Sequence, residues 1–468
     1  MIISPQAAKY TPARDILEVA NIGDAVKPAN FPKHIVRFRN DRWAPSVGLN
    51  DLSDAQWINH FGRFAPMEGS LSEPLALRYH GHQFRVYNPE IGDGRGFLFA
   101  QMRDHLGRLM DLGTKGSGQT PYSRFGDGRL TLKGGVREIL ATEMLEAMGV
   151  QTSKTFSLIE TGEALERNDE PSPTRAAVLV RLSHSHIRIG SFQRAATLED
   201  EALLRALTNY ALTKLYGATP GENPAAQLLS LVVERTADLA ASYMIAGFVH
   251  GVLNSDNINI TGESFDYGPW RFTPFWEPGF TAAYFDHQGL YAFARQAEAI
   301  HWDVAQLALS LRPLSETEPL VDALNRFPDL YADAMRRRFC WRLGIAEGTA
   351  EQTATLMESA VRGMIETRVP IDRFYFDWRG GALRNAEAEQ LYAGPEWAAF
   401  LEQIASFANP AATEHPYWSS ASTCSMHIDE VEAIWSAIDK EDDWSVLERK
   451  VEAIRFMGEA HRLVPLVA

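Results

Sequence analysis

The first part of the chain is built from short apolar runs separated by polar loops that contain glycine or proline. Phe97–Met102 and Leu109–Leu112 flank a polar stretch with one glycine, and Thr155–Ile159 and Ala176–Leu182 flank a longer polar loop. Apolar runs of this length, bounded by turn residues, are typical of β-strands. The pattern therefore predicts two hairpins in this region.

Helical spacing of apolar residues first occurs between these hairpins. The apolar positions of Val136–Met148 recur at intervals of three and four residues, and Gly149 supplies a C-terminal stop. Beyond about Ser191 the pattern becomes mainly helical. The further helices that we expect are Leu203–Leu215, Leu228–Phe248, Trp302–Leu311, Leu330–Leu343, Ala354–Thr367 and Val431–Gly458.

This change of pattern predicts an α+β chain with two lobes. Residues 1–182 would form a mixed lobe with a β-sheet, and residues 183–468 a mainly helical lobe that ends in a helical extension. Segment 250–269 interrupts the helices with short apolar runs and asparagines, which is typical of a loop. Because loops on a rigid scaffold often carry chemistry, we expect functional residues in this segment.

The composition is ordinary for a globular protein, with 45% hydrophobic and 22% charged residues. A formal net charge of −15 disfavours binding to nucleic acid or to an anionic membrane surface, so we expect neither partner. Cys340 and Cys424 are too few for a disulfide framework. The N-terminus lacks a basic and then apolar signal, and no run of about 18 apolar residues occurs, so we expect a cytoplasmic protein.

Segment His250–Asn257, with the later Asp266-Tyr-Gly-Pro, has the layout of a phosphoryl-transfer site. Protein kinases space a catalytic-loop His and a metal-binding Asn in the same way, and place Asp-Phe-Gly downstream. Asn257 and Asp266 match those metal ligands, and their oxygens suit Mg²⁺ or Mn²⁺ that bridges nucleotide phosphates. Taken alone, the same residues could be turn residues beside a helix.

The catalytic base of this loop cannot be the usual one. Two residues after the histidine, where a kinase has its catalytic Asp, the chain has Val252, which cannot accept a proton. Asp256 is the nearest carboxylate and directly precedes Asn257. A base would thus approach from a different point of the loop, which indicates different chemistry.

Residues that could hold phosphates occur earlier in the chain. Lys115 follows a predicted strand and Glu138 lies on the next helix, as in the ion pair of a kinase, although separately they could be surface charges. The glycine-rich stretches 92–95 and 116–129 offer backbone N–H groups with interleaved arginines. Neither stretch is a Walker A loop, and both could be ordinary turns.

Two arginines follow the last predicted strand. Arg181 and Arg188 have the forked guanidinium that suits bidentate phosphate contact, and one could clamp a leaving pyrophosphate; the alternative is a pair of surface arginines. The two His-x-His pairs, at 80–82 and 184–186, lack a cysteine or carboxylate at zinc spacing. We assign no metal to these histidines.

Taken in order, these segments resemble the selenoprotein O family. Its members carry Tyr-Gly-Gly-His-Gln-Phe, Gly-Asp-Gly-Arg, Lys-Gly-x-Gly-Arg-Thr-Pro-Tyr-Ser-Arg and His-Gly-x-x-Asn-Thr-Asp-Asn. The corresponding stretches of this chain are Tyr79–Phe84, Gly92–Arg95, Lys115–Arg124 and His250–Asn257. Arg137-Glu138, the stretch from Arg181 to Ser191, and Asp266-Tyr-Gly-Pro also match.

The resemblance implies a protein-kinase-like bilobal fold that binds ATP in a flipped orientation. It implies transfer of AMP to Ser, Thr or Tyr hydroxyls of proteins with release of pyrophosphate, and leaves transfer of UMP open. By position it implies Asp256 as the proton acceptor and Asn257 and Asp266 as metal ligands. The nucleotide contacts that it implies are Gly92, Gly94, Arg95, Lys115, Asp127, Gly128, Arg181, Arg188 and Asp266, and Glu138 would pair with the lysine.

The chain departs from the family pattern at a few positions. His80 and Arg85 stand where glycines are expected, Gln119 stands where an arginine is expected, and the tail Pro465–Ala468 lacks the family's frequent selenocysteine or cysteine. Whether redox control operates without such a tail therefore stays open, and so does the preference for ATP or UTP. Two competing functions also stay open: a kinase that transfers the γ-phosphate with Asp256 as its base, and a non-catalytic nucleotide-binding scaffold.

Overall fold

The computed structural model describes residues 6–168 and 170–462. Its main sheet contains strands from the first 183 residues: β1 (Pro12–Ala13), β2 (Gly23–Ala25), β3 (Ile35–Arg39), β4 (Leu75–Leu77), β7 (Leu98–Arg103), β8 (Leu109–Lys115), β9 (Leu130–Thr131), β10 (Lys154–Leu165) and β11 (Thr174–Ser183). The strands are antiparallel in the order β2-β4-β7-β8-β11-β10-β3, with β1 beside β7 and β9 beside β11. Both predicted hairpins are present, as β7–β8 and as the longer β10–β11.

Two short ribbons supplement the main sheet. They are formed by β5 (Gly81–Gln83) with β6 (Val86–Asn88), and by β12 (Phe248–Val249) with β13 (Arg271–Phe272). The helices of the first lobe are α1 (Asp54–Phe61) and α2 (Leu132–Ala147). Those of the second are α3 (Ile189–Thr197), α4 (Glu201–Tyr210), α5 (Pro224–Ala246), α6 (Gln296–Ser310), α7 (Thr317–Asn325), α8 (Phe327–Leu343), α9 (Ala350–Thr367), α10 (Ile371–Asp377), α11 (Ala398–Ile404), α12 (Ile428–Glu441) and α13 (Ser445–Arg462).

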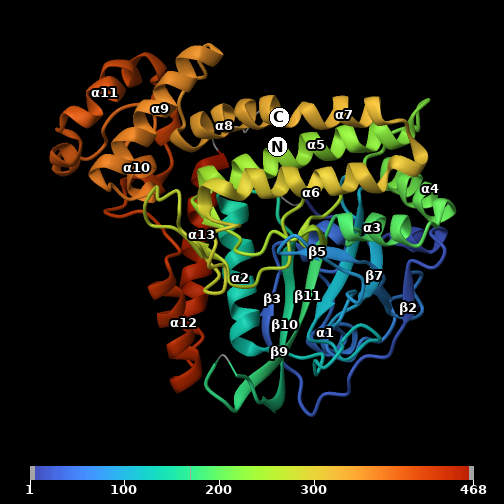
Figure 1. Ribbon diagram of the computed structural model, residues 1–468. Coiled ribbons are helices and arrows are strands. Elements are labelled where there is room, and N and C mark those ends of the chain that lie inside the picture. Colours follow the sequence, from blue (N-terminus) through green and yellow to red (C-terminus); the bar gives the residue numbers. More distant parts are fainter. Residues whose placement is uncertain (1–5, 169, 463–468) are drawn as a thin grey trace.

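The elements form two lobes, as Figure 1 shows: helices α5 to α8 stack over one end of the curled sheet, and α9 to α11 project to the side. This arrangement confirms the expected α+β, protein-kinase-like fold with a helical extension. The boundary at residue 182 itself stays a prediction. No helix within the described ranges is long and apolar enough to cross a membrane.

Helix α2 lies unusually close to the sheet. It begins at Leu132, earlier than the apolar pattern predicts, and the Thr131 hydroxyl accepts a hydrogen bond from the Gly134 N–H at 3.1 Å. A Cβ atom on Gly135 would lie 2.3 Å from Leu158 of β10, so only glycine fits this contact. The glycines that interrupt the apolar spacing at the start of α2 thus also allow the helix to approach the sheet.

The C-terminal helices lie along α2, on the side away from the sheet (Figure 1). The expected single helix Val431–Gly458 is wrong, because the chain breaks at Asp442, whose φ is +49°. The Asp442 carboxylate accepts hydrogen bonds from Arg175 at 2.8 Å and Arg37 at 3.2 Å, both in the sheet lobe. These long-range contacts hold the bend that separates α12 from α13.

The second of these helices, α13, is tied to α2 by charge. Arg455 donates two hydrogen bonds, of 2.9 and 2.7 Å, to the carboxylate of Glu143, which is buried on α2. Gly458 lets the two helices approach, since a Cβ there would lie 3.1 Å from Ala147. The C-terminal extension therefore fixes the position of α2.

The two lobes are also joined by a short ladder of hydrogen bonds behind the sheet. The Ser153 N–H donates to the Ser264 carbonyl at 2.9 Å, and the Ser264 N–H donates to the Gln151 carbonyl at 2.8 Å. The hydroxyls of Thr152 and Tyr267 lie 2.5 Å apart. The loop after α2 is thus held against the segment that leads to Asp266.

We expect Arg455→Met to lower the free energy of unfolding by about 1–2 kcal/mol, because Glu143 would keep, among the described residues, only the more distant Arg42 as an ion-pair partner, at 3.5 Å. The partial exposure of Arg455 limits the loss. Urea denaturation measures it. The matched control is Arg449→Met, which removes an exposed hydrogen bond to Ser445 on the same helix and should cost less than about 0.5 kcal/mol. Equal losses would contradict the role given to Arg455.

Candidate active site

A cavity of about 830 Å³ lies between the glycine-rich segments of the first lobe and segment 252–257 of the second. Its walls bring together residues that lie far apart in the sequence. All of the predicted catalytic, nucleotide-binding and metal-binding residues line it: Gly92, Gly94, Arg95, Lys115, Asp127, Gly128, Arg181, Arg188, Asp256, Asn257 and Asp266.

Lys115, at the end of β8, is the centre of the charged part of the cavity. Its ammonium pairs with the carboxylate of Glu138 on α2, lies 3.2 Å from Asp266 Oδ1 and donates to the Tyr267 carbonyl, also at 3.2 Å. The side chains of Lys115 and Glu138 are only 4% and 2% exposed. Because a buried charge is costly without a partner, this ion pair fixes α2 relative to the sheet.

Asp266 is held in a strained position between cations. Its φ of +63° lies in the left-handed region, which few residues other than glycine adopt. Arg181 lies 3.5 Å from its Oδ1 atom. Burial opposes ionisation of Asp266, but Lys115 and three nearby arginines hold its pKa well below the usual range. The carboxylate therefore stays charged, as a metal ligand must.

The turn that carries Asp256 is fixed by neighbouring side chains. The Ser255 hydroxyl donates to Gln193 at 2.6 Å and accepts from the His82 N–H at 2.7 Å. The Asn254 side chain accepts from the Phe84 N–H at 3.0 Å and from the Tyr291 hydroxyl at 2.7 Å. These bonds join the β5–β6 ribbon to the loop, and so position the residue that follows them.

Asp256 itself is buried, and its Oδ1 atom has no hydrogen-bond partner within the described part of the chain. Burial raises the pKa of its carboxyl to about 6, with the Arg188 cation opposing the rise. Gly81 lies directly against it, since a Cβ on Gly81 would be 2.9 Å from both the Cβ and the Oδ1 of Asp256. The carboxyl is thus confined, and within the described part of the chain its buried Oδ1 atom has no hydrogen-bond partner.

Asn257 presents its carbonyl oxygen for other contacts, because its amide nitrogen donates to the Val252 carbonyl at 3.0 Å. With the charged Asp266, it gives the cavity two hard oxygen donors from different turns. Mg²⁺ prefers such ligands and usually keeps several positions for water and phosphate, so the residues present fit it. No cluster of three or more His, Cys, Asp or Glu residues that could hold a metal occurs among residues 6–168 and 170–462.

Arg188 is buried and has two partners that the sequence analysis missed. Its guanidinium lies 3.3 Å from Asp93 and 4.1 Å from the centre of the Tyr79 ring, and it donates to the Asp256 carbonyl at 3.2 Å. Asp93 lies inside the Gly-Asp-Gly-Arg repeat and Tyr79 opens the Tyr-x-Gly-His-Gln-Phe segment. The duplicated tetrapeptide was the available signal for Asp93, but nothing in the sequence linked Tyr79 to an arginine.

The glycine-rich stretches pack against one another at the rim. A Cβ on Gly92 would lie 2.5 Å from the ring of Tyr122, so the close approach requires glycine. Asp127 is 2.9 Å from Arg167 in the β10–β11 loop, which closes this side of the cavity. Phe125 projects from the same stretch and is fully exposed, a feature that the sequence analysis did not single out.

The positions that depart from the family pattern lie beside the nucleotide residues rather than among them. Arg85 has a φ of +62°, which explains a glycine in relatives, and pairs with Glu298 at 3.0 Å. His80 lies 2.7 Å from the Tyr87 hydroxyl, and Gln119 donates to the Gly126 carbonyl at 2.8 Å. The tail Pro465–Ala468 lies outside the described residues.

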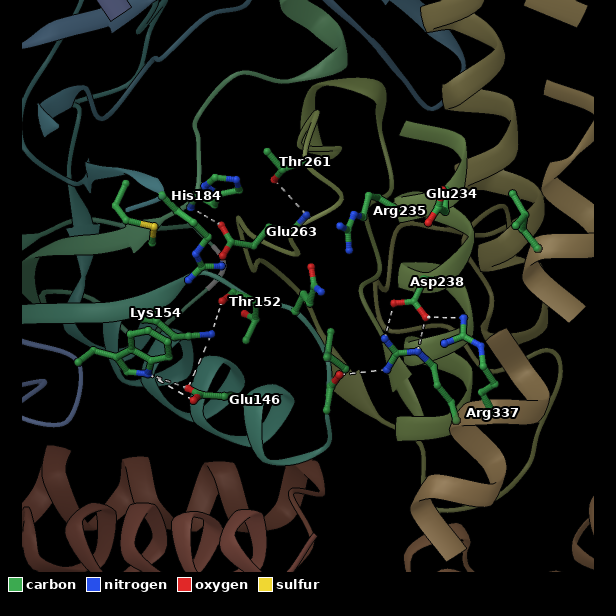
Figure 2. Close-up of a pocket in the computed structure, with 18 of the residues that line it drawn as sticks. Glu146, Thr152, Lys154, His184, Glu234, Arg235, Asp238, Thr261, Glu263 and Arg337 are labelled. Carbon is green, nitrogen blue, oxygen red and sulfur yellow. Dashed lines mark hydrogen bonds and ion pairs between the residues drawn. The ribbon is translucent and has the colours of Figure 1, made fainter. Parts of the chain in front are cut away.

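A second cavity, of about 370 Å³, lies behind the sheet between the loop after α2 and helices α5 and α8. Figure 2 shows acidic and basic side chains converging on it. Lys154 lies 3.7 Å from Glu146, Arg338 pairs with Asp238, and Glu263 accepts the His184 N–H at 2.8 Å. Because these charges are paired and no predicted site residue lines this cavity, we place the active site in the larger one.

The fold and the cavity together define a kinase-like enzyme whose loop differs from that of a kinase at the base. The family model described as protein adenylyltransferase SelO matches residues 6–455. A protein nucleotidyltransferase YdiU of Trichodesmium erythraeum is 41% identical over 455 residues, which cover 90% of this chain and 93% of that protein. One of Synechocystis sp. is 39% identical and covers 92% and 95%.

The chain therefore belongs to the protein adenylyltransferase SelO family, and it is a nucleotidyltransferase. A solved structure of ROP2 from Toxoplasma gondii, a virulence factor with a protein-kinase fold and no enzymatic activity, is also similar. It is 12% identical and covers 71% of this chain and 84% of its own, with a TM-score of 0.24, too low to support any conclusion here.

The contact between Gly81 and Asp256 generates a prediction. Gly81→Ala should displace the carboxyl and lower nucleotidyl transfer about 10- to 100-fold, while nucleotide affinity stays within about two-fold. Turnover and calorimetric binding measure the two effects. Gly279→Ala is the matched control, because a Cβ there meets nothing within 4 Å. A parallel fall in affinity and turnover would show that Gly81 serves the nucleotide instead.

Proposed function

We propose that this enzyme transfers AMP from ATP to Ser, Thr or Tyr hydroxyls of proteins and releases pyrophosphate, with Mg²⁺ or Mn²⁺ bound at Asn257 and Asp266. The observation that carries the proposal is the location of the available carboxyl. Val252 occupies the position of the kinase base, whereas Asp256, whose Oδ1 atom has no hydrogen-bond partner among residues 6–168 and 170–462, borders the same cavity. The relatives are named protein nucleotidyltransferases, which supports the same class of reaction.

In this proposal the basic side chains bind the part of ATP that departs. Lys115 and Arg181 already converge on Asp266, so a triphosphate beside them would be held by cations and by the backbone N–H groups of Gly92 and Gly94. The metal ion would neutralise phosphate charge and orient the α-phosphorus for attack. Arg95, Asp127, Gly128 and Arg188 would complete the nucleotide contacts.

Asp256 would take the proton of the attacking hydroxyl. As the oxygen of the acceptor bonds to the α-phosphorus, the bond from that phosphorus to the bridging oxygen breaks, and pyrophosphate leaves with the electron pair. A carboxylate in a confined position acts as a base without needing to reorganise. Gly81 and the hydrogen-bonded Asn254 and Ser255 would keep this carboxyl in place.

Three alternatives are separated by the fate of the nucleotide. Transfer of UMP would use the same residues with UTP, a kinase would transfer the γ-phosphate and form ADP, and a scaffold would bind ATP without turnover.

We also propose a reducing compartment such as the cytoplasm, in keeping with the free thiols of Cys340 and Cys424.

Incubation with ATP labelled in the α- or the γ-phosphate tests the proposal. We expect the α-label on protein, a gain of AMP mass and release of pyrophosphate. Protein that carries only the γ-label, together with ADP, would establish a kinase. The same incubation with UTP compares the two nucleotides.

Two substitutions separate binding from transfer. Asp266→Ala should abolish metal-dependent nucleotide binding, because it removes the charged ligand beside Lys115. Asp256→Ala should keep nucleotide affinity within about three-fold and lower transfer by at least about 100-fold. Calorimetry with ATP and turnover measure both variants. If Asp256→Ala loses binding as fully as Asp266→Ala does, Asp256 is a ligand rather than the base.

A further inference from the structure

A smaller cavity of about 250 Å³ adjoins the nucleotide cavity beside the first turns of α2. Among the described residues, five basic side chains line it, and Glu170 is the one acidic residue. The basic residues are Arg95, Lys115, Arg129, Arg137 and Arg167. All of them except Arg137 also line the nucleotide cavity, so the two cavities share a wall of cations.

Arg137 is the cation that belongs to the small cavity alone. Its guanidinium donates to the carbonyls of Gly268, at 3.4 Å, and Trp270, at 3.0 Å, and lies 4.7 Å from the Trp270 ring centre. Its burial and the neighbouring Arg271 cation lower its pKa to about 10. No carboxylate of the described residues forms an ion pair with Arg137, and the nearby Glu432 is held by Lys133 at 2.7 Å. An anion in the cavity would supply the missing partner.

The start of α2 adds positive potential to the same wall. Thr131 and Gly134, in the cap and first turn of this 16-residue helix, line the cavity. Gly134 has no side chain to cover the backbone there, and the N-terminal end of a helix favours anions. This contribution reinforces that of the arginines and would not define a site by itself.

Arg95 connects the two cavities. Its backbone carbonyl accepts from the Gly116 N–H at 2.6 Å, which fixes its base. Its guanidinium is exposed and forms no hydrogen bond or ion pair within the described ranges of the chain. The side chain is therefore free to follow an anion from the nucleotide cavity into the smaller one.

We propose that the small cavity receives the pyrophosphate that AMP transfer releases. The proposal rests on the proposed function. When the bond between the α-phosphorus and the bridging oxygen breaks, that oxygen keeps the electron pair, so the departing pyrophosphate carries more negative charge than the same atoms in ATP. Lys115 lines both cavities, and Arg137, which forms no ion pair with a carboxylate of the described residues, lines only the smaller one. Movement into this cavity would clear the nucleotide site for the next ATP.

Binding of inorganic pyrophosphate to the full chain tests this assignment. We expect Arg137→Met, which keeps an apolar stem over Trp270, to lower pyrophosphate affinity about ten-fold in calorimetry with Mg²⁺. ATP affinity should change less than two-fold, because Arg137 does not line the nucleotide cavity. Pyrophosphate should likewise become a weaker product inhibitor of Arg137→Met, while the KM for ATP stays constant.

Two further variants guard against a loss of folding. Thr131→Asp keeps a side-chain acceptor for the Gly134 N–H at the start of α2, adds a carboxylate to the cavity, and should also weaken pyrophosphate selectively. Arg271→Met is the matched control, because Arg271 also donates to the Trp270 carbonyl but does not line the cavity; its pyrophosphate affinity should stay at the wild-type value.

Two results would overturn the assignment: unchanged pyrophosphate affinity in both Arg137→Met and Thr131→Asp, or an equal loss of ATP and pyrophosphate affinity. Failure of the proposed function is a separate observation, since it would show in wild-type protein as absent α-label transfer. Direct pyrophosphate binding requires no turnover and can be measured in either case.

Discussion

The ion pair of Lys115 with Glu138, extended to Asp266, is the constraint on which the active site depends. These three charges come from a strand, a helix and a loop of the second lobe, so the contact holds only if all three elements are in place. A buried pair of this kind specifies position more than it adds stability. Arg455 of α13 pairs with Glu143, which lies on α2 about one and a half turns after Glu138. The C-terminal helices thereby support the catalytic geometry from outside the site.

The same arrangement explains how a kinase-like scaffold can serve another reaction. In the proposed function the carboxyl moves from the usual kinase position, now Val252, to Asp256, which shifts the proposed base along the loop and leaves the proposed metal ligands in place. Arg188 contacts the Asp256 backbone while pairing with Asp93, which ties the proposed base to the first glycine-rich stretch. In the proposed function, the move of the carboxyl from position 252 to position 256 leads to attack at the α-phosphorus. Pyrophosphate then departs towards Arg137.

Much of the fold and the site could be predicted because the signals were local. The strand-length apolar runs predicted the β7–β8 and β10–β11 hairpins. The order of Lys115, Glu138 and segment 250–269 predicted that these residues meet at one site. What the sequence could not supply depends on long-range contacts. The bend at Asp442 is held by arginines from β3 and near the start of β11, and the partnership of Arg188 with Tyr79 needs the folded chain. The apolar pattern did not predict the start of α2, because Gly134 and Gly135 stand there and their role is close packing.

The central claim is that one metal-bound triphosphate lies among Lys115, Asn257 and Asp266, with its α-phosphorus facing Asp256. A crystal structure with Mn²⁺ and a non-hydrolysable ATP analogue, using anomalous scattering to locate the metal, tests it most directly. We expect the Mn²⁺ signal between Asn257 and Asp266, and the α-phosphorus nearer to Asp256 than the γ-phosphorus is. A γ-phosphorus facing Asp256, or a metal and nucleotide bound elsewhere, would contradict the account.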